Sequence, residues 1–389
     1  MEAIVLAGGL GTRLRSAVSN LPKCMAPIRD TPFLSFILDW LQDQGADHVI
    51  LSVGYLREYI INWISGQNYP FEIDFAVEET PLGTGGGIRE ALKYCHGKKV
   101  FVINGDTFFP VDLNAFTFDA PVTVALKPMK DFDRYGAVEM RFLDSAFGSA
   151  RNDIVEITGF MEKGYCSEGL INGGVYALND LDLSGFPPKF SFEKEVLEPL
   201  KYKTRGIILD CYFLDIGIPE DYEKAQTELP EYRALKNASK KLLNSDADTL
   251  LIDRDGTINV RIPGDYVRSW EQFRFVSGIL EEFPKWAAKF RRIIVVTNQR
   301  GVGRGLMTDE DLADIHSHML RAITEAGGRI DAILTCTATD DGDPRRKPNP
   351  GMYHEAKQLF PSMERTIMLG DSETDAAFAE NAGIPFILL

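Results

Sequence analysis

The chain has 389 residues, of which 44% are hydrophobic and 25% are charged, and its formal net charge is −15. This length exceeds what one ordinary hydrophobic core organises, so we expect two domains of a globular protein. The acidic charge argues against a nucleic-acid partner, and no apolar run approaches the roughly 18 residues of a membrane span.

The N-terminus and the cysteines indicate the compartment. The chain enters its first predicted strand directly, without the pattern of a signal peptide. Its five cysteines are scattered and include no Cys-x-x-Cys pair, as expected of reduced thiols in a cytoplasm. An acidic protein binds anionic phosphates through local Arg and Lys side chains and bound cations, so we expect its acidic clusters to hold Mg²⁺.

The first predicted element is a buried strand at residues 4–6, which runs into a loop containing Gly8, Gly9 and Gly11. Glycines there let backbone N–H groups approach an anion closely, and Arg13 and Arg15 add positive charge nearby. A strand that feeds a glycine loop is a phosphate cradle by geometry. Taken alone, the same loop is equally a glycine turn of an α/β fold.

The strands and helices that follow alternate along the first part of the chain. Apolar runs at residues 49–53, 100–103 and 122–126 predict strands, and helical spacing of apolar residues predicts a helix at 33–44. This alternation predicts an α/β fold with a mostly parallel sheet, in which ligands bind beyond the carboxyl ends of the strands.

The glycine loop resembles, together with a later motif, the signature of the sugar-1-phosphate nucleotidyltransferases. In that family a Gly-Gly-x-Gly-Thr-Arg-Leu loop is followed by Pro-Lys-x-x-x-Pro, which here occupies residues 22–27. The resemblance implies a glycosyltransferase-A-like, Rossmann-like domain. It implies catalytic roles for Arg13 and Lys23 and nucleotide binding by Leu6, Gly8, Gly9, Gly11 and Thr12.

Two further glycine-containing motifs fit the same family. The segment Leu82-Gly83-Thr84-Gly85 matches one that contacts the base and sugar of the nucleotide, although by composition it is a flexible loop. Asn104-Gly105-Asp106 ends an apolar strand, where a carboxylate is well placed for Mg²⁺, and the alternative is an Asp that caps a turn. The resemblance pairs Asp106 with Asp215 as metal ligands.

The resemblance also implies the residues that contact the sugar and its phosphate. Lys163 lies in a Glu-Lys pair and Asn172 precedes Gly-Gly-Val-Tyr, and both motifs occur in the family at this point. Without those neighbours, Lys163 would be one more solvated lysine. Residues 131–136 and 170–174 look most like the guanylyltransferases that act on D-glycero-α-D-manno-heptose 1-phosphate, which implies GTP as the nucleotide.

Residues 225–246 are polar and charged and indicate a terminal helix that runs into a linker. A new apolar strand begins at Thr249, so we place the domain boundary near Asn244, with domains at 1–244 and 245–389.

The second domain begins with two carboxylates, Asp253 and Asp255, directly after a buried strand. Burying two such charges is costly unless something uses them, although a solvated acidic turn is the simpler alternative. The order of Asp-x-Asp-Gly-Thr, a strand that ends in Thr297, a lysine at Lys347 and Gly-Asp at Asp371 resembles the haloacid-dehalogenase-like phosphatases, which are also Rossmann-like α/β domains.

That resemblance implies a role for each residue. Asp253 attacks phosphorus and forms an aspartyl phosphate, and Asp255 protonates the leaving oxygen and then activates water. Thr297 and Lys347 hold the phosphoryl group. Mg²⁺ is held by Asp371, by Asp253 and by the backbone carbonyl of Asp255, with Asp375 in support.

The motifs are most similar to those of D-glycero-D-manno-heptose 1,7-bisphosphate 7-phosphatases, with histidinol phosphatases as close relatives. The similarity implies that Asn298 contacts the substrate and that Arg304 and Arg346 meet its phosphates. Relatives carry a Cys/His zinc loop ahead of Arg-Lys-Pro, but only Cys336 remains here, so we expect no structural zinc. Ser372 also stands where relatives often carry lysine, and His316 and His318 are expected to be ordinary surface or packing residues.

The two resemblances meet at one intermediate, heptose 1-phosphate, and together imply an enzyme of GDP-heptose synthesis. Its small-molecule substrates would be GTP and heptose phosphates. Two alternatives stay open. In the first, the same two reaction types act on another sugar phosphate, such as mannose 1-phosphate, and on another phosphate ester, such as histidinol phosphate. In the second, one domain is a non-catalytic scaffold. The sequence does not indicate the oligomeric state, the anomer preference or channelling.

Overall fold

Strand β1 (Glu2–Leu6) lies in the middle of the parallel part of a nine-stranded sheet, between β4 (His48–Val53) and β6 (Lys99–Asn104). The neighbouring edge strand is β5 (Glu72–Val77), and all four strands run parallel. The computed structural model describes residues 1–9, 14, 18, 20–143 and 154–389. The predicted strands at 49–53, 100–103 and 122–126 are all confirmed.

The other half of this sheet is largely antiparallel, so the expectation of a mostly parallel sheet is wrong for it. Strand β11 (Cys166–Asn179) runs antiparallel to both β6 and β8 (Val122–Phe132), and β12 (Thr204–Ile208) is parallel to β8. Strands β10 (Ile154–Phe160) and β9 (Val138–Phe142) complete the edge with antiparallel pairing. Antiparallel strands tolerate water on one face, and the alternating burial of β10 fits that arrangement.

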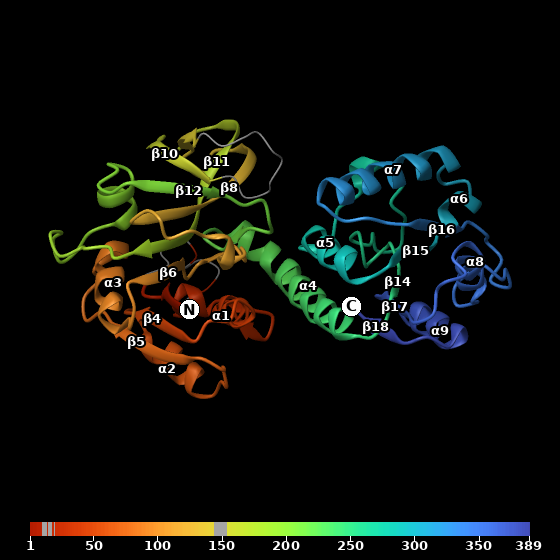
Figure 1. Ribbon diagram of the computed structural model, residues 1–389, viewed down its shortest axis with the longest axis horizontal. Helices are drawn as coiled ribbons and strands as arrows, with labels where there is room; N and C mark the ends of the chain where they lie inside the picture. The colour runs from red at the N-terminus through yellow and green to blue at the C-terminus, as the bar shows by residue number, and fades with distance from the viewer. Residues whose placement is uncertain (10–13, 15–17, 19, 144–153) are drawn as a thin grey trace. The chain divides into compact units, whose positions relative to one another are not determined.

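Three helices belong to the parallel half: α1 (Leu34–Asp43), α2 (Arg57–Ser65) and α3 (Gly83–Ala91). Helix α1 confirms the helical spacing predicted there, and seven of its ten residues are buried. Helix α3 packs against β1, β4 and β5, as Figure 1 shows in orange beside these strands. Its glycines are helical rather than part of a flexible loop, because the segment 186–193 packs close to their backbone.

Two short ribbons stand apart from the main sheet. Strands β2 (Pro27–Ile28) and β3 (Thr31–Pro32) form one, and β7 (Thr107–Phe108) and β13 (Leu214–Asp215) form the other. The second ribbon brings together two segments that are more than one hundred residues apart in the sequence, which matters for the site described below.

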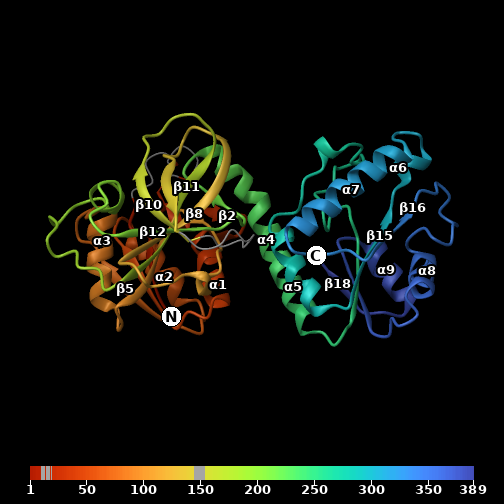
Figure 2. The same ribbon diagram turned by 45° about the horizontal axis from the view of Figure 1, so that its top comes forward.

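The second unit has a five-stranded, fully parallel sheet in the order β16-β15-β14-β17-β18. Its strands are β14 (Thr249–Ile252), β15 (Arg292–Asn298), β16 (Ala332–Cys336), β17 (Thr366–Gly370) and β18 (Phe386–Leu388). Its helices are α5 (Ile279–Lys289), α6 (Arg300–Gly303), α7 (Asp309–Glu325), α8 (Gly351–Leu359) and α9 (Glu373–Ala382), which Figure 2 shows around the sheet. This doubly wound arrangement is the α/β fold that the sequence predicts.

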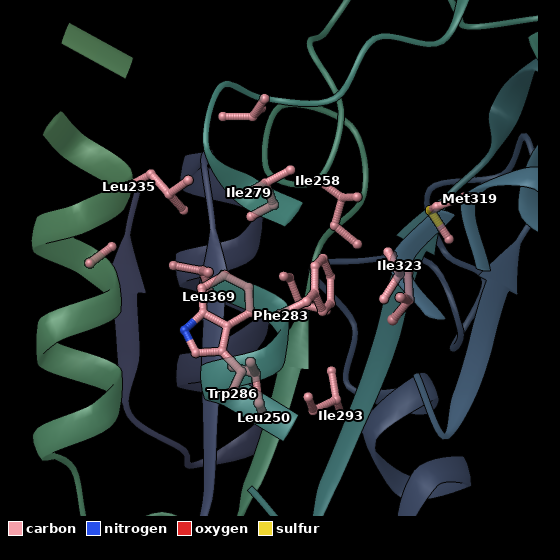
Figure 3. Packing of buried hydrophobic residues seen from close by; sticks show 14 of the residues in the cluster. Leu235, Leu250, Ile258, Ile279, Phe283, Trp286, Ile293, Met319, Ile323 and Leu369 are labelled. Atoms are coloured by element: carbon pink, nitrogen blue, oxygen red, sulfur yellow. The ribbon is translucent and has the colours of Figure 1, made fainter. Parts of the chain in front are cut away.

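Helix α4 (Pro219–Asn244) is where the chain passes from one compact unit, Met1–Thr227, to the other, Glu228–Leu389. The sequence predicts this helix but places the domain boundary at its end, whereas the division by compactness falls within it. The reason is visible in Figure 3, where Leu235 of α4 lies in the same core as Phe283 and Trp286 of α5. The second half of α4 is therefore part of the hydrophobic core of the second unit. Within the described residues, no helix is long and apolar enough to cross a membrane.

Candidate active sites

A pair of carboxylates lies at the carboxyl end of β6 in the first unit. Asp106 lies two residues after β6, and the antiparallel ribbon pairs Asp215 with Thr107, so the two aspartates become neighbours. Gly105 is required between β6 and Asp106, because a Cβ there would collide with the backbone oxygen of Leu6. The sequence prediction that Asp106 and Asp215 form a pair is consistent with this geometry.

Lys23 lies between the two carboxylates. Its Nζ is 2.6 Å from Asp106 Oδ2 and 3.7 Å from Asp215 Oδ1, and its side chain is only 11% exposed. Burial and the nearby charge of Asp106 raise the pKa of Asp215 above its ordinary value, although Lys23 opposes this. A divalent cation would offset the same repulsion, and paired carboxylate oxygens are the donors that Mg²⁺ prefers. The residues present therefore fit a magnesium ion.

The amide of Asn104 lies against a turn of β11. Gly174 has a φ of +74°, and a Cβ there would lie 2.7 Å from Asn104 Nδ2, so the close approach needs glycine. Asn172 accepts a hydrogen bond from the Gly174 N–H (2.9 Å) and donates one to the Tyr176 hydroxyl (3.0 Å). The Oδ1 atom of Asn104 is buried and has no hydrogen-bond partner within the described residues.

The glycine motif of α3 and the loop after β1 meet at Glu78, which the sequence analysis missed. The Glu78 carboxylate accepts hydrogen bonds from the Ser52 hydroxyl and from the Leu82 N–H, both 2.9 Å. A Cβ at Gly8 or at Gly87 would lie 2.9 Å from Glu78 Oε1. The signal that could have found Glu78 is its position just after β5, at the same sheet edge as Gly8.

Gly83, Thr84 and Gly85 face the segment that follows residue 189. A Cβ at Gly83 would lie 2.5 Å from the Phe190 oxygen, and one at Gly85 would collide with the Phe190 ring. The Thr84 hydroxyl donates to Glu193 (2.5 Å) and accepts from the Phe192 N–H (2.9 Å). These contacts are packing contacts, and their predicted role in nucleotide binding stays a prediction.

Several predicted residues of this unit are not brought into the cluster. Gly11, Thr12 and Arg13 lie outside the described residues. Gly9 is exposed with open space around its Cα, and Lys163 is exposed in the segment between β10 and β11. Leu6 joins the site through its backbone, because its carbonyl accepts a hydrogen bond from the Gly105 N–H (3.1 Å).

In the second unit, Asp253 lies at the carboxyl end of β14 and forms an ion pair with Lys347. Lys347 Nζ is 2.6 Å from Asp253 Oδ1 and 2.5 Å from Asp375 Oδ1, and all three side chains are at least nine-tenths buried. Burial raises the pKa of Asp253, whereas Lys347 acts in the opposite direction by favouring the carboxylate. Ser372, at the N-terminus of α9, donates to the second oxygen of Asp375 (2.6 Å). The lysine thus holds two carboxylates at once.

Asp371 completes an acidic cluster with these residues. Carboxylate oxygens of Asp253, Asp371 and Asp375 lie within 4.8 Å of one another. Arg261, which the sequence analysis missed, donates to Asp371 Oδ1 (2.9 Å) and to the backbone oxygen of Asp255 (3.2 Å). Three carboxylates and a carbonyl form an all-oxygen donor set, so this site also fits Mg²⁺. The Asp255 side chain is not part of this cluster, and the role of its backbone carbonyl as a metal ligand stays a prediction.

The Asp255 carboxylate is held instead by neighbours that sequence reasoning did not single out. Arg254 Nη2 donates to both carboxylate oxygens (2.8 and 2.9 Å), Asn259 donates to Oδ1 (3.0 Å) and Gln299 donates to Oδ2 (2.6 Å). Burial alone raises the pKa of Asp255, but these donors, Arg254 above all, bring it below its ordinary value. His316, expected to be an ordinary surface or packing residue, lies with Nε2 3.2 Å from Arg254 Nη1.

The remaining predicted residues divide between the pocket and its surroundings. Thr297 is buried and accepts a hydrogen bond from Gln299 (2.8 Å), and Asn298 exchanges two hydrogen bonds with the backbone of Lys347 (both 3.0 Å). Arg346 instead forms an ion pair with Asp341 (2.9 Å), and Arg304 is exposed. A pocket of about 220 Å³ is lined by residues that include Asp253, Asp255, Arg261, Tyr266, Thr297, Asn298, Lys347, Ser372 and Asp375.

Known proteins resemble each unit separately. Residues 2–231 match the nucleotidyl transferase family, and residues 344–389 match a HAD-hydrolase-like family. The chain is 48% identical over 241 residues to a D-glycero-alpha-D-manno-heptose 1-phosphate guanylyltransferase of Aneurinibacillus thermoaerophilus, which covers 60% of this chain and 100% of that protein. It is 38% identical over 135 residues to a D-glycero-alpha-D-manno-heptose-1,7-bisphosphate 7-phosphatase of Mycobacterium bovis, which covers 34% of this chain and 71% of that protein.

A solved structure extends the likeness of the first unit. The structure of HddC from Yersinia pseudotuberculosis complexed with GMP-PN has a TM-score of 0.52 and 36% sequence identity, and it covers 59% of this chain and 99% of that chain. The matched lengths agree with a fusion of two enzymes, each of which occurs elsewhere as a separate chain.

Proposed function

The chain belongs to the nucleotidyl transferase family, and its second unit is a haloacid-dehalogenase-like phosphatase; from this premise we propose that it carries out two consecutive steps of GDP-heptose synthesis. The phosphatase unit removes the 7-phosphate of heptose 1,7-bisphosphate. The guanylyltransferase unit then transfers GMP from GTP to the heptose 1-phosphate and releases pyrophosphate. The observation that carries the proposal is the similarity of each unit to a separate enzyme that uses or makes the same sugar phosphate.

The phosphatase reaction starts at Asp253. One of its carboxylate oxygens attacks phosphorus and forms an aspartyl phosphate as the bond from phosphorus to the sugar oxygen breaks. Lys347, 2.6 Å away, favours the ionised nucleophile and remains beside the transferred phosphoryl group. Asp255 in its protonated form donates a proton to the departing sugar oxygen, and then, as the carboxylate that Arg254 favours, takes one from the water that hydrolyses the aspartyl phosphate.

Asp253, Asp371 and the carbonyl of Asp255 would hold Mg²⁺, which would offset negative charge on the phosphoryl group. Asp375 supports the site by fixing Lys347 (2.5 Å). Thr297 lines the pocket and contributes a hydroxyl toward the phosphoryl oxygens.

Guanylyl transfer needs no protein nucleophile. An oxygen of the sugar phosphate attacks the α-phosphorus of GTP directly, so this unit contributes positioning and electrostatic stabilisation. Lys23 neutralises charge beside the carboxylate pair, and Asp106 and Asp215 would hold Mg²⁺. The buried Oδ1 of Asn104 is an acceptor suited to a hydroxyl or amino group of the substrates.

Both substrates of the proposed pathway are small molecules, and we place the enzyme in the cytoplasm. The five cysteines support this assignment, since none of them forms a disulfide within the described part of the chain. No nucleic-acid or membrane partner is proposed.

The test is a one-pot reaction of the pure chain with Mg²⁺, GTP and each anomer of heptose 1,7-bisphosphate, followed by mass spectrometry. Formation of GDP-heptose from one anomer supports both units and identifies the anomer. Phosphate release without GDP-heptose would contradict the assignment of the first unit. No turnover would favour the same two reaction types on other substrates, for which mannose 1-phosphate and histidinol phosphate are the first to try.

A further inference from the structure

The carboxylate of Asp255 is oriented by an arginine that water does not reach. Arg254 has a relative exposure of 0%, and its Nη2 donates to both oxygens of Asp255, at 2.8 and 2.9 Å. A donor group that contacts both oxygens of a carboxylate fixes the plane of that carboxylate as well as its position. Asn259 and Gln299 each contact one of these oxygens, at 3.0 and 2.6 Å, but only Arg254 contacts both, so the plane of the carboxylate depends on what fixes its guanidinium.

The other side of that guanidinium contacts His316 on helix α7. Nη1 of Arg254 lies 3.2 Å from Nε2 of His316. Arginine carries only donors, so the histidine nitrogen must be the acceptor. His316 is then a neutral imidazole with its proton on Nδ1. Burial, together with the neighbouring charge of Arg254, lowers the pKa of His316 to about 4, which agrees with a neutral ring.

Helix α7 holds this imidazole in place through the core. Leu312, Ile315 and Met319 are buried members of the same hydrophobic cluster, on the helix face that carries His316. A capping box at Thr308 and Asp311 fixes the N-terminus of the helix. The acceptor is therefore presented by a rigid element rather than by a loop.

We propose that His316 is a positioning residue of the phosphatase reaction, which acts through Arg254 to aim the carboxylate of Asp255 at the leaving oxygen. The inference rests on the proposed role of Asp255 as the proton donor. Without an acceptor at position 316, a donor of the buried guanidinium loses its partner, which is unfavourable, and the guanidinium reorients to find another. Asp255 then loses its orientation while Asp253 and Lys347, which do not contact His316, keep theirs.

The test compares two classes of phosphate ester by kcat/KM, which includes substrate binding and the transfer of phosphate to Asp253 but not the later hydrolysis of the aspartyl phosphate. An alkyl phosphate such as the heptose bisphosphate needs a proton at its leaving oxygen, whereas p-nitrophenyl phosphate releases p-nitrophenolate, a stable anion. We expect His316→Leu to lower kcat/KM about tenfold or more for the alkyl ester, within the range of general acid catalysis, and much less for the aryl ester. Equal losses for both esters would overturn the proposal, because a merely structural defect affects them alike.

Three controls complete the series. His316→Gln retains an acceptor oxygen and should restore most of the alkyl-ester activity that His316→Leu loses. His318→Leu removes a histidine from the same helix that stacks on Trp270 and does not take part in the contact with Arg254, so its activity should match the unaltered chain. Guanylyl transfer by the first unit should be unchanged in all variants. Full activity of His316→Leu, or failure of glutamine to rescue it, would overturn the proposal.

A measurement without substrate tests the contact itself. In the NMR spectrum of the full chain labelled with ¹⁵N-histidine, the signal of His316 is the one that disappears in His316→Gln. At pH 7 it should show an unprotonated Nε2 and a proton on Nδ1. A proton on Nε2 would overturn the proposal whatever the activities are. If the unaltered chain hydrolyses p-nitrophenyl phosphate but not heptose bisphosphate, the proposed substrate is wrong, and the kinetic comparison proceeds with another alkyl phosphate that the chain hydrolyses.

Discussion

Lys347 forms an ion pair with Asp253 whose N–O distance is 2.6 Å and whose two side chains are 4% and 7% exposed. The pair joins residues that are 94 positions apart in the sequence. A buried carboxylate without a partner is costly. The contact with Lys347 therefore favours the ionised form of Asp253 and stabilises the fold at the carboxyl end of β14. Several predictions on the two units depend on such buried pairs.

Replacing Asp253 with Asn should abolish phosphatase activity and leave guanylyl transfer from supplied heptose 1-phosphate intact. The amide cannot form the aspartyl phosphate, whereas the first unit has its own carboxylate pair. Asp106→Asn is the matched control and should give the reverse pattern. Separate assays of phosphate release and of GDP-heptose formation measure both, and loss of both activities in a folded Asp253→Asn chain would contradict independent sites.

Replacing Lys347 with Met should destabilise the second unit by about 3–5 kcal/mol, because it leaves two carboxylates buried and unpaired. Urea unfolding measures this by tryptophan fluorescence in a chain in which Trp40, Trp63 and Trp270 are replaced with Phe, so that only the buried Trp286 of the second unit emits. Lys357→Met, at an exposed position of α8, should change the free energy of unfolding by less than about 1 kcal/mol. Similar stabilities for the two variants would show that the Lys347 pairs do not stabilise the fold.

Magnesium should stabilise the second unit even when no substrate is present. It would offset the repulsion among Asp253, Asp371 and Asp375, and a ligand at 100 times its dissociation constant adds about 2.7 kcal/mol. A melting curve with Mg²⁺ and with EDTA measures the shift. Asp371→Asn should lose most of it, and a shift of full size in that variant would place the cation elsewhere.

The stability of the first unit should depend on pH through His48. This residue is 3% exposed, and its ring nitrogens lie 2.9 Å from Glu2 and 3.2 Å from Asp74, so both contacts are hydrogen bonds only when the ring is protonated. Burial disfavours that charge, but the two carboxylates prevail and raise the pKa of His48. The stabilisation is complete below the unfolded pKa of about 6.5 and is lost as the pH rises through the higher folded value.

The measurement for His48 is the difference in melting temperature between the unaltered chain and His48→Gln. It should be larger at pH 5.5 than at pH 9. A difference that is constant with pH, or that grows toward pH 9, would show that the ring is neutral in the folded protein.

Leu235→Ala should destabilise the second unit by about 2–5 kcal/mol, although the residue precedes the boundary predicted from the sequence. Leu235 is fully buried in the core that includes Trp286. Asn237→Ala, exposed on the same helix, is the control and should have little effect. If Leu235→Ala left the free energy of unfolding of the second unit, as measured by Trp286 fluorescence, unchanged, the second half of α4 would not belong to this core.

The sequence predicted these strands well because their pattern is local. The strands that precede Gly8, Asp106 and Asp253 are visible as apolar runs followed closely by glycine or aspartate, and the structure confirms each strand. The sequence could not predict the antiparallel half of the first sheet, because the direction of each strand depends on the path by which the chain returns to the sheet. Nor could it predict that the glycines of α3 are helical, since that depends on the packing of Phe190 against them.

The partners of the functional groups were also beyond the sequence. Glu78, Arg261 and Arg254 are ordinary charged residues in the sequence, and only their contacts distinguish them. His316 is 62 residues from Arg254, and helical spacing alone indicated an ordinary surface or packing residue. The position of the domain division within α4 has the same origin, because a polar helix gives no sign of the core into which its few apolar residues pack.

By itself, the sequence determined the two families and the fold class and proposed the residues that carry the chemistry, because short motifs at strand ends are typical of phosphate-binding and nucleophilic sites. Only the tertiary structure decided which groups face one another: Lys23 between Asp106 and Asp215, Lys347 between Asp253 and Asp375, and His316 behind Arg254. The physical reason is that charge state and orientation are set by neighbours a few ångströms away, and parallel sheets and long helices bring those neighbours from distant parts of the chain.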